Sequence, residues 1–184
     1  MINPYIAGEH VYLRHPTEED VSGRWYEWFS DEETTKYLVD RYWPNSIEAQ
    51  LELFKSLTRD NNRLVLSIVD RSKDVHIGVL GLSSINWIHR YAEGSIIIGE
   101  DSYRKMPYTT ETTDLMHKIT FLRLNLLNLK SAYASSNEGA EALQRLFKYT
   151  KVGVYKELLL IDGHADDLIV GVLNRESWKV EMQR

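Results

Sequence analysis

Two titratable side chains and one basic pair are the residues of this sequence best suited to chemistry. Glu93 stands at the start of an aliphatic run, and His89 lies just upstream in a predicted loop. A carboxylate, or an imidazole with its near-neutral pKa, can take a proton from a nucleophile within hydrogen-bond reach. Arg104 and Lys105 stand directly before a predicted helix start, where free N–H groups and the helix dipole favour a bound phosphate.

Each of these residues also has a purely structural interpretation. Glu93 could be a solvated glutamate at a strand end, and His89 a structural or solvated loop histidine. Arg104 and Lys105 could be an ordinary exposed pair. Asn137 precedes a predicted helix, where asparagine most often serves as the cap.

Aromatic side chains form a second set of candidates. Trp43, in the run Tyr-Trp-Pro at residues 42–44, and Trp87 fall on predicted loops, where binding residues concentrate. Aromatic faces suit sugar or nucleotide rings, although most aromatic residues of a domain serve packing. We therefore predict Trp43, Trp87 and His89 as substrate-site residues.

The absence of cysteine from the 184 residues excludes several chemistries. No disulfide, thiolate nucleophile or cysteine-ligated zinc or iron–sulfur site can form. No Gly-x-Ser-x-Gly sequence marks a serine nucleophile. The six histidines show no metal-ligand spacing such as His-x-x-x-His, so we expect no metal.

Charge and hydropathy indicate which kinds of partner and which cellular compartment to expect. The chain has 22 Lys and Arg against 27 Asp and Glu, a formal net charge of −5, which argues against nucleic acid as a partner. No apolar run approaches the roughly 18 residues of a membrane helix, so we expect no membrane partner. Residues 1–10 lack the apolar core of a signal peptide, and we predict a cytoplasmic protein.

The elements that must position these residues follow from the hydrophobic spacing. Predicted strands cover residues 11–13, 64–69, 75–85, 95–98, 130–135, 152–161 and 168–173, and predicted helices begin at Thr17, Ser46, Thr109 and Gly139. Gly78 and Gly81, inside a strand, indicate a bulge or a close backbone approach. The dipeptide Asp162-Gly163 between two apolar runs predicts a hairpin turn.

The order of these elements predicts the class of fold. It reads β, α, α, β, β, β, α, β, α, β, β, which is typical of one mixed α/β domain, here residues 1–184. The lack of regular βαβ alternation disfavours a Rossmann-type dinucleotide domain. We expect one face of the first helix to carry Trp25, Trp28 and Phe29. The helix from Thr109 should bury an apolar stripe formed by Leu115, Ile119, Leu122 and Leu126.

Several local stretches, taken in order, carry a resemblance to a known family. They are residues 8–14 (GEHVYLR), 28–33 (WFSDEE), 92–99 (AEGSIIIG), 103–128, the segment that begins at Asn137, 167–169 (DLI) and 176–178 (ESW). Together they cover nearly the whole chain. They resemble the GCN5-related N-acetyltransferase (GNAT) superfamily, and within it the ribosomal-protein N-terminal and amino-sugar acetyltransferases.

This resemblance implies an α+β fold, with a mixed, largely antiparallel central sheet flanked by helices. It also implies an acetyl-CoA-dependent N-acetyltransferase, in which a primary amine of a nucleotide-linked amino sugar or a protein N-terminus attacks the thioester directly. Glu93 would relay the proton of the amine. The cofactor would be bound by the backbone of Ile96, Ile97 and Ile98 and by Arg104, Lys105, Tyr108, Thr109, Thr110 and Asn137.

Three positions depart from the family pattern. The family's pyrophosphate turn reads Arg/Gln-x-x-Gly-x-Gly/Ala, whereas here Pro107 replaces the first glycine and Thr109 the second. Proline has no N–H, and one lost amide donor would cost about 1–3 kcal/mol of phosphate binding. Arg104 and Lys105 could compensate by charge. Gln144 stands where the family often has a tyrosine that protonates the leaving thiolate.

Two alternatives to an acetyl-CoA-dependent enzyme stay open. One is a non-catalytic GNAT-fold protein with a binding or regulatory role, which the three departures favour. The other is an acyltransferase that uses a different thioester donor, such as an acylated carrier protein. Exposed strand edges near the C-terminus are compatible with a homodimer.

Overall fold

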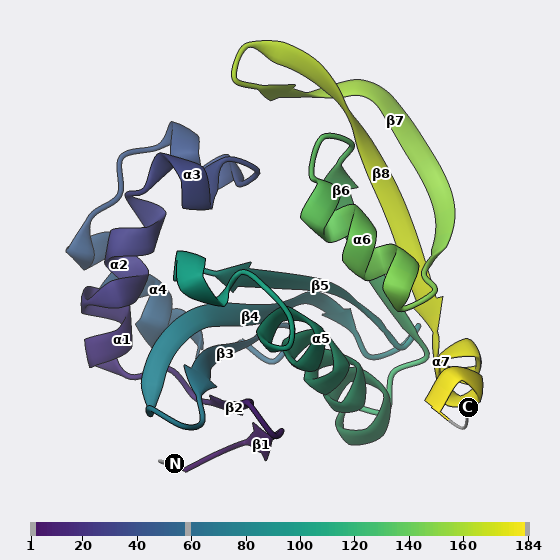
Figure 1. Ribbon diagram of the computed structural model, residues 1–184, viewed down its shortest axis with the longest axis horizontal. Coiled ribbons are helices and arrows are strands. Elements are labelled where there is room, and N and C mark those ends of the chain that lie inside the picture. The colour runs from purple at the N-terminus through teal and green to yellow at the C-terminus, as the bar shows by residue number, and fades with distance from the viewer. Residues whose placement is uncertain (1–2, 58–59, 183–184) are drawn as a thin grey trace. The chain divides into compact units, whose positions relative to one another are not determined.

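The computed structural model describes residues 3–57 and 60–182, and over them it confirms a mixed, mostly antiparallel sheet with flanking helices (Figure 1). The strands are β1 (Ile6–Ala7), β2 (Val11–Arg14), β3 (Leu64–Asp70), β4 (Val75–Asn86), β5 (Tyr91–Ile98), β6 (Asn128–Ala134), β7 (Thr150–Ile161) and β8 (His164–Asn174). Their hydrogen-bonded order is β1-β2-β3-β4-β5-β6-β8-β7. β5 and β6 pair in parallel, whereas β2–β3, β3–β4, β6–β8 and β7–β8 are antiparallel.

The helices follow the predicted order with several additions. They are α1 (Glu18–Ser22), α2 (Arg24–Phe29), α3 (Glu32–Thr35), α4 (Ile47–Leu57), α5 (Tyr108–Lys118), α6 (Glu138–Leu146) and α7 (Arg175–Met182), with the 3-10 turns η1 (Val39–Tyr42) and η2 (Asp101–Tyr103) and the π-helical η3 (Ile119–Arg123). Within the described ranges, no helix is both long enough and apolar enough to cross a membrane.

The packing divides the chain into two compact units. Unit 1 comprises residues 1–83 and 95–116, and unit 2 comprises residues 84–94 and 117–184. Unit 1 holds β1 to β3, α1 to α4 and the start of α5, whereas unit 2 holds β6 to β8, α6 and α7. The chain passes from one unit to the other within β4, β5 and α5. A single domain over residues 1–184 stays a prediction.

The first predicted helix is two short helices. Thr17 begins α1 with a capping box, because its hydroxyl accepts the Asp20 N–H while the Asp20 carboxylate accepts the Thr17 N–H. Gly23 then ends α1 with φ −104° and ψ −114°, well outside the helical region. Because glycine weakens helices, the chain restarts there as α2, which buries Trp25 and Trp28.

A bulge and a close approach both occur at Gly78. The β3–β4 register shifts between Ile68, opposite Gly78, and Val69, opposite His76, which leaves Ile77 as the extra residue. A Cβ atom at Gly78 would collide with the main-chain carbonyl of Ile97 on β5. The residue at position 78 must therefore be glycine for β4 and β5 to approach as they do.

In unit 2 the long β7–β8 hairpin turns at the predicted dipeptide. Asp162 and Gly163 have φ of 50° and 81°, as a hairpin turn of the primed type requires. The helix α7, which follows β8, was not predicted. It buries Trp178 against Phe121, with ring centroids 5.2 Å apart.

The expected apolar stripe after Thr109 is wrong at Leu122. The regular helix ends at Lys118 and continues as the π-helical η3, in which the wider turn rotates later side chains away from the α-helical spacing. Leu122 is 59% exposed, whereas Leu115, Ile119 and Leu126 are buried. The stripe thus holds at Leu115 and Ile119, whereas Leu126 is buried beyond the end of η3 at Arg123 and is not part of the helix.

Candidate active site

Glu93 is the third residue of β5 and lies in unit 2. It is opposite Lys130 in the parallel pairing with β6, and Glu93 Oε2 lies 3.1 Å from Lys130 Nζ. The two neighbours of Glu93, Ala92 and Gly94, are buried, whereas the Glu93 side chain itself is 36% exposed. The carboxylate is therefore accessible and held by one flexible ammonium group.

The carboxyl end of β5 lies in unit 1, where Ile96 and Ile97 are half-buried and Ile98 is buried. The Gly99 N–H donates to the Ile77 carbonyl of β4 at 3.0 Å. The Ile98 carbonyl accepts a hydrogen bond from Arg104 Nε at 2.9 Å. Unit 1 thus brings Arg104 directly to the backbone of the strand that the resemblance assigns to pantetheine.

The turn before α5 presents a different set of donors from the family's glycine turn. The N–H groups of Tyr108, Thr109 and Thr110 form the first turn of α5, where amides lack partners within the helix. Of these, Thr109 N–H donates to the Lys105 carbonyl at 3.3 Å, and the Thr110 hydroxyl donates to the Pro107 carbonyl at 2.9 Å. Lys105 is exposed. The Tyr108 and Thr110 amides and the Lys105 ammonium group are donors of the kind that hold a phosphate, so the residues present fit a CoA pyrophosphate.

Tyr108 is also part of a small aromatic group in unit 1. Its ring contacts Tyr103 edge-on, with centroids 4.7 Å apart, and His10 with centroids 6.2 Å apart. Tyr103 is buried, and burial raises the pKa of its hydroxyl. This packing fixes the start of α5 on the segment that leads into β2.

Three further predicted site residues lie in unit 2. Asn137 caps α6, since its Oδ1 accepts the Ala140 N–H at 3.1 Å. Trp87 is 48% exposed in the connection between β4 and β5. His89 is exposed in the same connection, and its N–H donates to Asn86 Oδ1 at 2.8 Å.

Neither Gln144 nor Tyr149 is presented as an exposed acid. Gln144 Nε2 donates to the Ser131 carbonyl at 3.1 Å, and the side chain lies against Gly171. The Tyr149 hydroxyl lies 2.9 Å from Nε2 of the buried His117. Burial raises the pKa of Tyr149 and lowers the pKa of His117 to about 3, so both groups are neutral at pH 7. His117 belongs to the interior of unit 2, and Tyr149 lies half-buried beside it.

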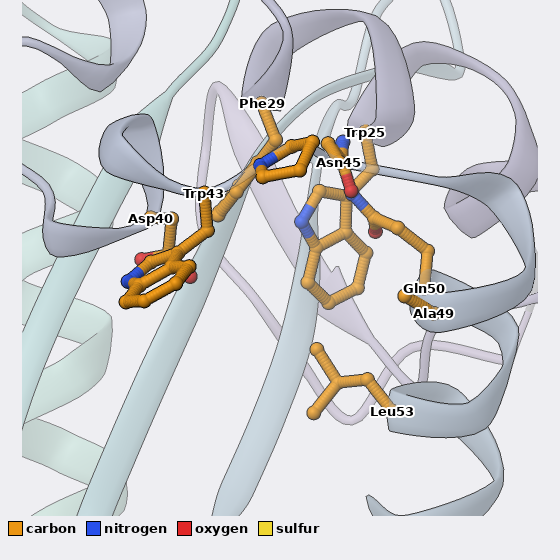
Figure 2. Close-up of a pocket in the computed structure, with 9 residues that line it drawn as sticks. Trp25, Phe29, Asp40, Trp43, Asn45, Ala49, Gln50 and Leu53 are labelled. Atoms are coloured by element: carbon orange, nitrogen blue, oxygen red, sulfur yellow. The ribbon is translucent and has the colours of Figure 1, made fainter.

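Trp43 lines a pocket of about 230 Å³ in unit 1. The pocket is formed by Trp25, Phe29, Asp40, Trp43, Pro44, Asn45, Ala49, Gln50 and Leu53. Figure 2 shows Asp40 and Trp43 on one side of it and Asn45 and Gln50 on the side of α4, with Trp25 between them. Trp43 is 73% exposed, whereas Trp25 and Gln50 are buried. The pocket thus combines an accessible aromatic face with a buried floor.

A second cavity of about 490 Å³ adjoins this pocket and shares Phe29, Trp43, Pro44 and Asn45 with it. It adds the polar side chains of Glu32 and Arg41. Sequence reasoning found Trp43 but missed Asp40, Asn45 and Gln50. The sequence showed Gln50 four residues before Phe54, on the apolar face of the predicted helix, but it did not show that Gln50 meets Trp43.

Comparison with known proteins identifies the family. Residues 10–147, more than half of the chain, match the family model described as acetyltransferase (GNAT) domain. A search of curated proteins finds no match.

The spermidine N-acetyltransferase from Vibrio cholerae, solved with CoA and spermine, is similar with a TM-score of 0.83 and 21% identity over 92% of this chain and 98% of that one. A probable acetyltransferase is similar with a TM-score of 0.80 and 19% identity over 93% and 96%. A dodecameric structure of the Vibrio cholerae enzyme gives a TM-score of 0.78 and 22% identity over 92% and 96%. At these identities the likeness concerns the fold, and it agrees with the family match. The chain belongs to the GNAT family of acetyltransferase domains.

Proposed function

We propose that this GNAT domain is an N-acetyltransferase that moves an acetyl group from acetyl-CoA to a primary amine. The observation that carries the proposal is the start of α5, where first-turn amides and the exposed Lys105 provide donors for a pyrophosphate although Pro107 has replaced a glycine. The test is calorimetry with acetyl-CoA, followed by an assay of thiol release with a panel of amines. No binding at millimolar acetyl-CoA would contradict the proposal.

The cofactor-holding residues come from three parts of the chain. The main chain of Ile96, Ile97 and Ile98 would bind the pantetheine arm, and Lys105, Tyr108, Thr109 and Thr110 the pyrophosphate. Asn137 uses its Oδ1 to cap α6 and would bind the arm through its side-chain Nδ2 group. When bound, acetyl-CoA supplies an activated acyl carbonyl, and its thiolate leaves as the new amide bond forms.

Glu93 is the proposed proton acceptor. The attacking nitrogen must lose a proton for the amide product to form, and the Glu93 carboxylate is accessible enough to take it directly or through one water. Lys130 lies 3.1 Å from the same carboxylate and orients it before the reaction.

The Trp43 pocket supports an acceptor with a ring and an amine. Trp43, Trp25 and Phe29 offer apolar faces for a ring, and Asp40 provides a carboxylate for an ammonium group. A nucleotide-linked amino sugar meets both requirements, and it is the acceptor class that we propose first, with Trp87 and His89 as further acceptor contacts. Protein N-termini and polyamines, the latter because the Vibrio cholerae relative is a spermidine N-acetyltransferase, complete the panel.

Binding without turnover is the competing proposal. It is favoured by Gln144, which bonds to the main chain where the family often has its acidic tyrosine. It is also favoured by Tyr149, which is half-buried and whose hydroxyl lies against the buried His117. Acetyl-CoA binding without thiol release on any amine would support it. Turnover of an acylated carrier protein, with poor binding of free CoA, would instead support a different thioester donor.

We also propose that the protein self-associates through β7. This edge strand exposes Val152, Tyr155, Leu158 and Leu160, each more than half accessible. An exposed apolar edge strand is a template for pairing with another chain, and a relative of similar fold forms a dodecamer. Light scattering on the wild type and on L158E would test the proposal, since a charge on this edge should favour the monomer.

A further inference from the structure

The Arg104 guanidinium group forms hydrogen bonds and an ion pair with several residues of unit 1. Besides the Ile98 carbonyl, it bonds through Nη2 to the Gly99 carbonyl at 3.2 Å and to Thr34 Oγ1 at 2.6 Å. Its Nη1 pairs with Asp101 at 2.9 Å. A guanidinium has five N–H donors in one rigid plane, so these contacts use most of them. A phosphate on Arg104 would have to compete with these bonds for all but one of the N–H groups.

Thr34 carries the connection onward to the start of α3. Its hydroxyl accepts from Arg104 and donates to Asp31 Oδ2 at 2.7 Å, and its N–H donates to the same oxygen at 2.7 Å. Asp31 is the N-cap of α3. The bonded chain Arg104–Thr34–Asp31 thus joins the carboxyl end of β5 to the first turn of α3.

The neighbouring residues make a matching connection to α2. Glu100 accepts a hydrogen bond from Trp28 Nε1 at 2.8 Å and forms an ion pair with Arg24. Gly99 lies against the Trp28 ring so closely that a Cβ atom would collide with it. The residues directly after β5 therefore hold two helices of unit 1 at once.

We propose that Arg104 is a positioning residue and not a phosphate ligand. It holds α3 to the end of β5, so that a cofactor bound along β5 orders the segment that runs from α3 through η1 to Trp43. The inference rests on the proposed function, because it assigns the phosphate charge to Lys105 and the acceptor pocket to Trp43. Acetyl-CoA binding should then order the Trp43 side of the acceptor pocket, although the cofactor itself does not contact the pocket.

Hydrogen exchange on the full chain tests this coupling. The amides to follow are Thr35 N–H, bonded to the Asp31 carbonyl at 3.1 Å, and Leu38 N–H, bonded to the Thr35 carbonyl at 2.8 Å. In the wild type, acetyl-CoA should slow their exchange. In R104M their exchange should be about tenfold faster or more, since hydrogen bonds to charged groups are lost, and acetyl-CoA should no longer slow it.

K105M is the matched control, because it removes the adjacent exposed cation. It should weaken acetyl-CoA binding about tenfold in calorimetry and leave α3 exchange in the free protein unchanged. T34V should speed α3 exchange as much as R104M does, and the double variant should be little faster than either single variant. T34S keeps a hydroxyl at this position, so its exchange should stay slow. If R104M does not fold, T34V and T34S carry the test.

The outcomes separate this inference from the proposed function. Unchanged α3 exchange in R104M and T34V would overturn the inference, as would a loss of acetyl-CoA affinity in R104M equal to that in K105M. Failure of the wild type to bind acetyl-CoA would overturn the proposed function and the cofactor coupling. The exchange difference between R104M and K105M would still show whether Arg104 holds α3.

Discussion

The two ends of β5 are held in different ways. Near its start, Glu93 forms an ion pair with Lys130, whose side chain is 43% exposed. At its carboxyl end, the residues from Gly99 to Arg104 are bonded to β4, α2 and α3 through main chain and side chains. A group that must gain and lose a proton profits from access, whereas a cofactor strand profits from rigidity. In the proposed function, the same strand combines a loosely held proton acceptor with a firmly held cofactor strand.

The largest effect is expected at the loosely held end. E93Q keeps the shape of the side chain but removes its basicity, so turnover should fall about 100-fold or more. The Kd of acetyl-CoA should change little, because Glu93 is not among the proposed cofactor contacts. Steady-state rates and calorimetry measure the two quantities, and an unchanged rate would exclude Glu93 as the proton acceptor.

Acid should destabilise both units, since each encloses a buried histidine. Burial lowers the pKa of His76 to about 4, despite the nearby Asp20, and the pKa of His117 to about 3. The unfolded chain binds protons at these rings below about pH 6.5, so the stability present above that pH is lost as pH falls toward 4 and 3.

Between about pH 6.5 and its folded-state pKa, each histidine should lower the free energy of unfolding by about 1.4 kcal/mol for every unit by which pH falls. Urea denaturation at pH 7, 5.5 and 4 measures the loss. A free energy of unfolding that stays level from pH 7 to pH 4 would contradict burial of these two neutral rings.

At the carboxyl end of β5, packing leaves no room for an added methyl group at Gly99. G99A places a Cβ atom against the Trp28 ring, and such overpacking should lower the free energy of unfolding by about 1–3 kcal/mol. G153A on β7 is the control, because a Cβ atom there meets no atom within 4 Å. Urea denaturation of both variants tests the contrast, and equal stabilities would show that the Gly99–Trp28 contact is not tight.

The smallest effect on stability is expected for the ion pair at the start of β5. K130A removes the partner of Glu93, but an exposed pair contributes little, so the free energy of unfolding should change by less than about 1 kcal/mol. If K130A lowered the free energy of unfolding more than G99A does, the carboxyl end of β5 would not be the more firmly held end.

Local chemistry explains which elements could be predicted. Thr17 and Asn137 are cap residues, and both bond to helix amides as their types require. Asp162-Gly163 tolerates positive φ at both positions and forms the hairpin turn. The break at Gly23 and the π-helix after Lys118 were missed, because hydrophobic spacing continues across both and only packing decides between a continuous and an interrupted helix.

The candidate site was predicted less completely than the fold. Glu93, the β5 backbone and the start of α5 could be placed from strand and helix signals and from the resemblance. Asp40, Asn45 and Gln50 could not, because they meet in one pocket only after η1 and α4 have packed on α2. A sequence shows the type of a side chain but not its neighbours.

Arg104 illustrates the division between sequence and tertiary structure most clearly. The sequence by itself determined the order of strands and helices, the absence of thiol chemistry and the replacement of a glycine by Pro107, because these depend on residue type and local spacing. Both residues are exposed, and only the tertiary structure decided that the Arg104 side chain, unlike that of Lys105 next to it, bonds to Thr34, Ile98 and Gly99. Adjacent cations look alike in a sequence, and the difference arises because long-range packing brings hydrogen-bond acceptors to one of them.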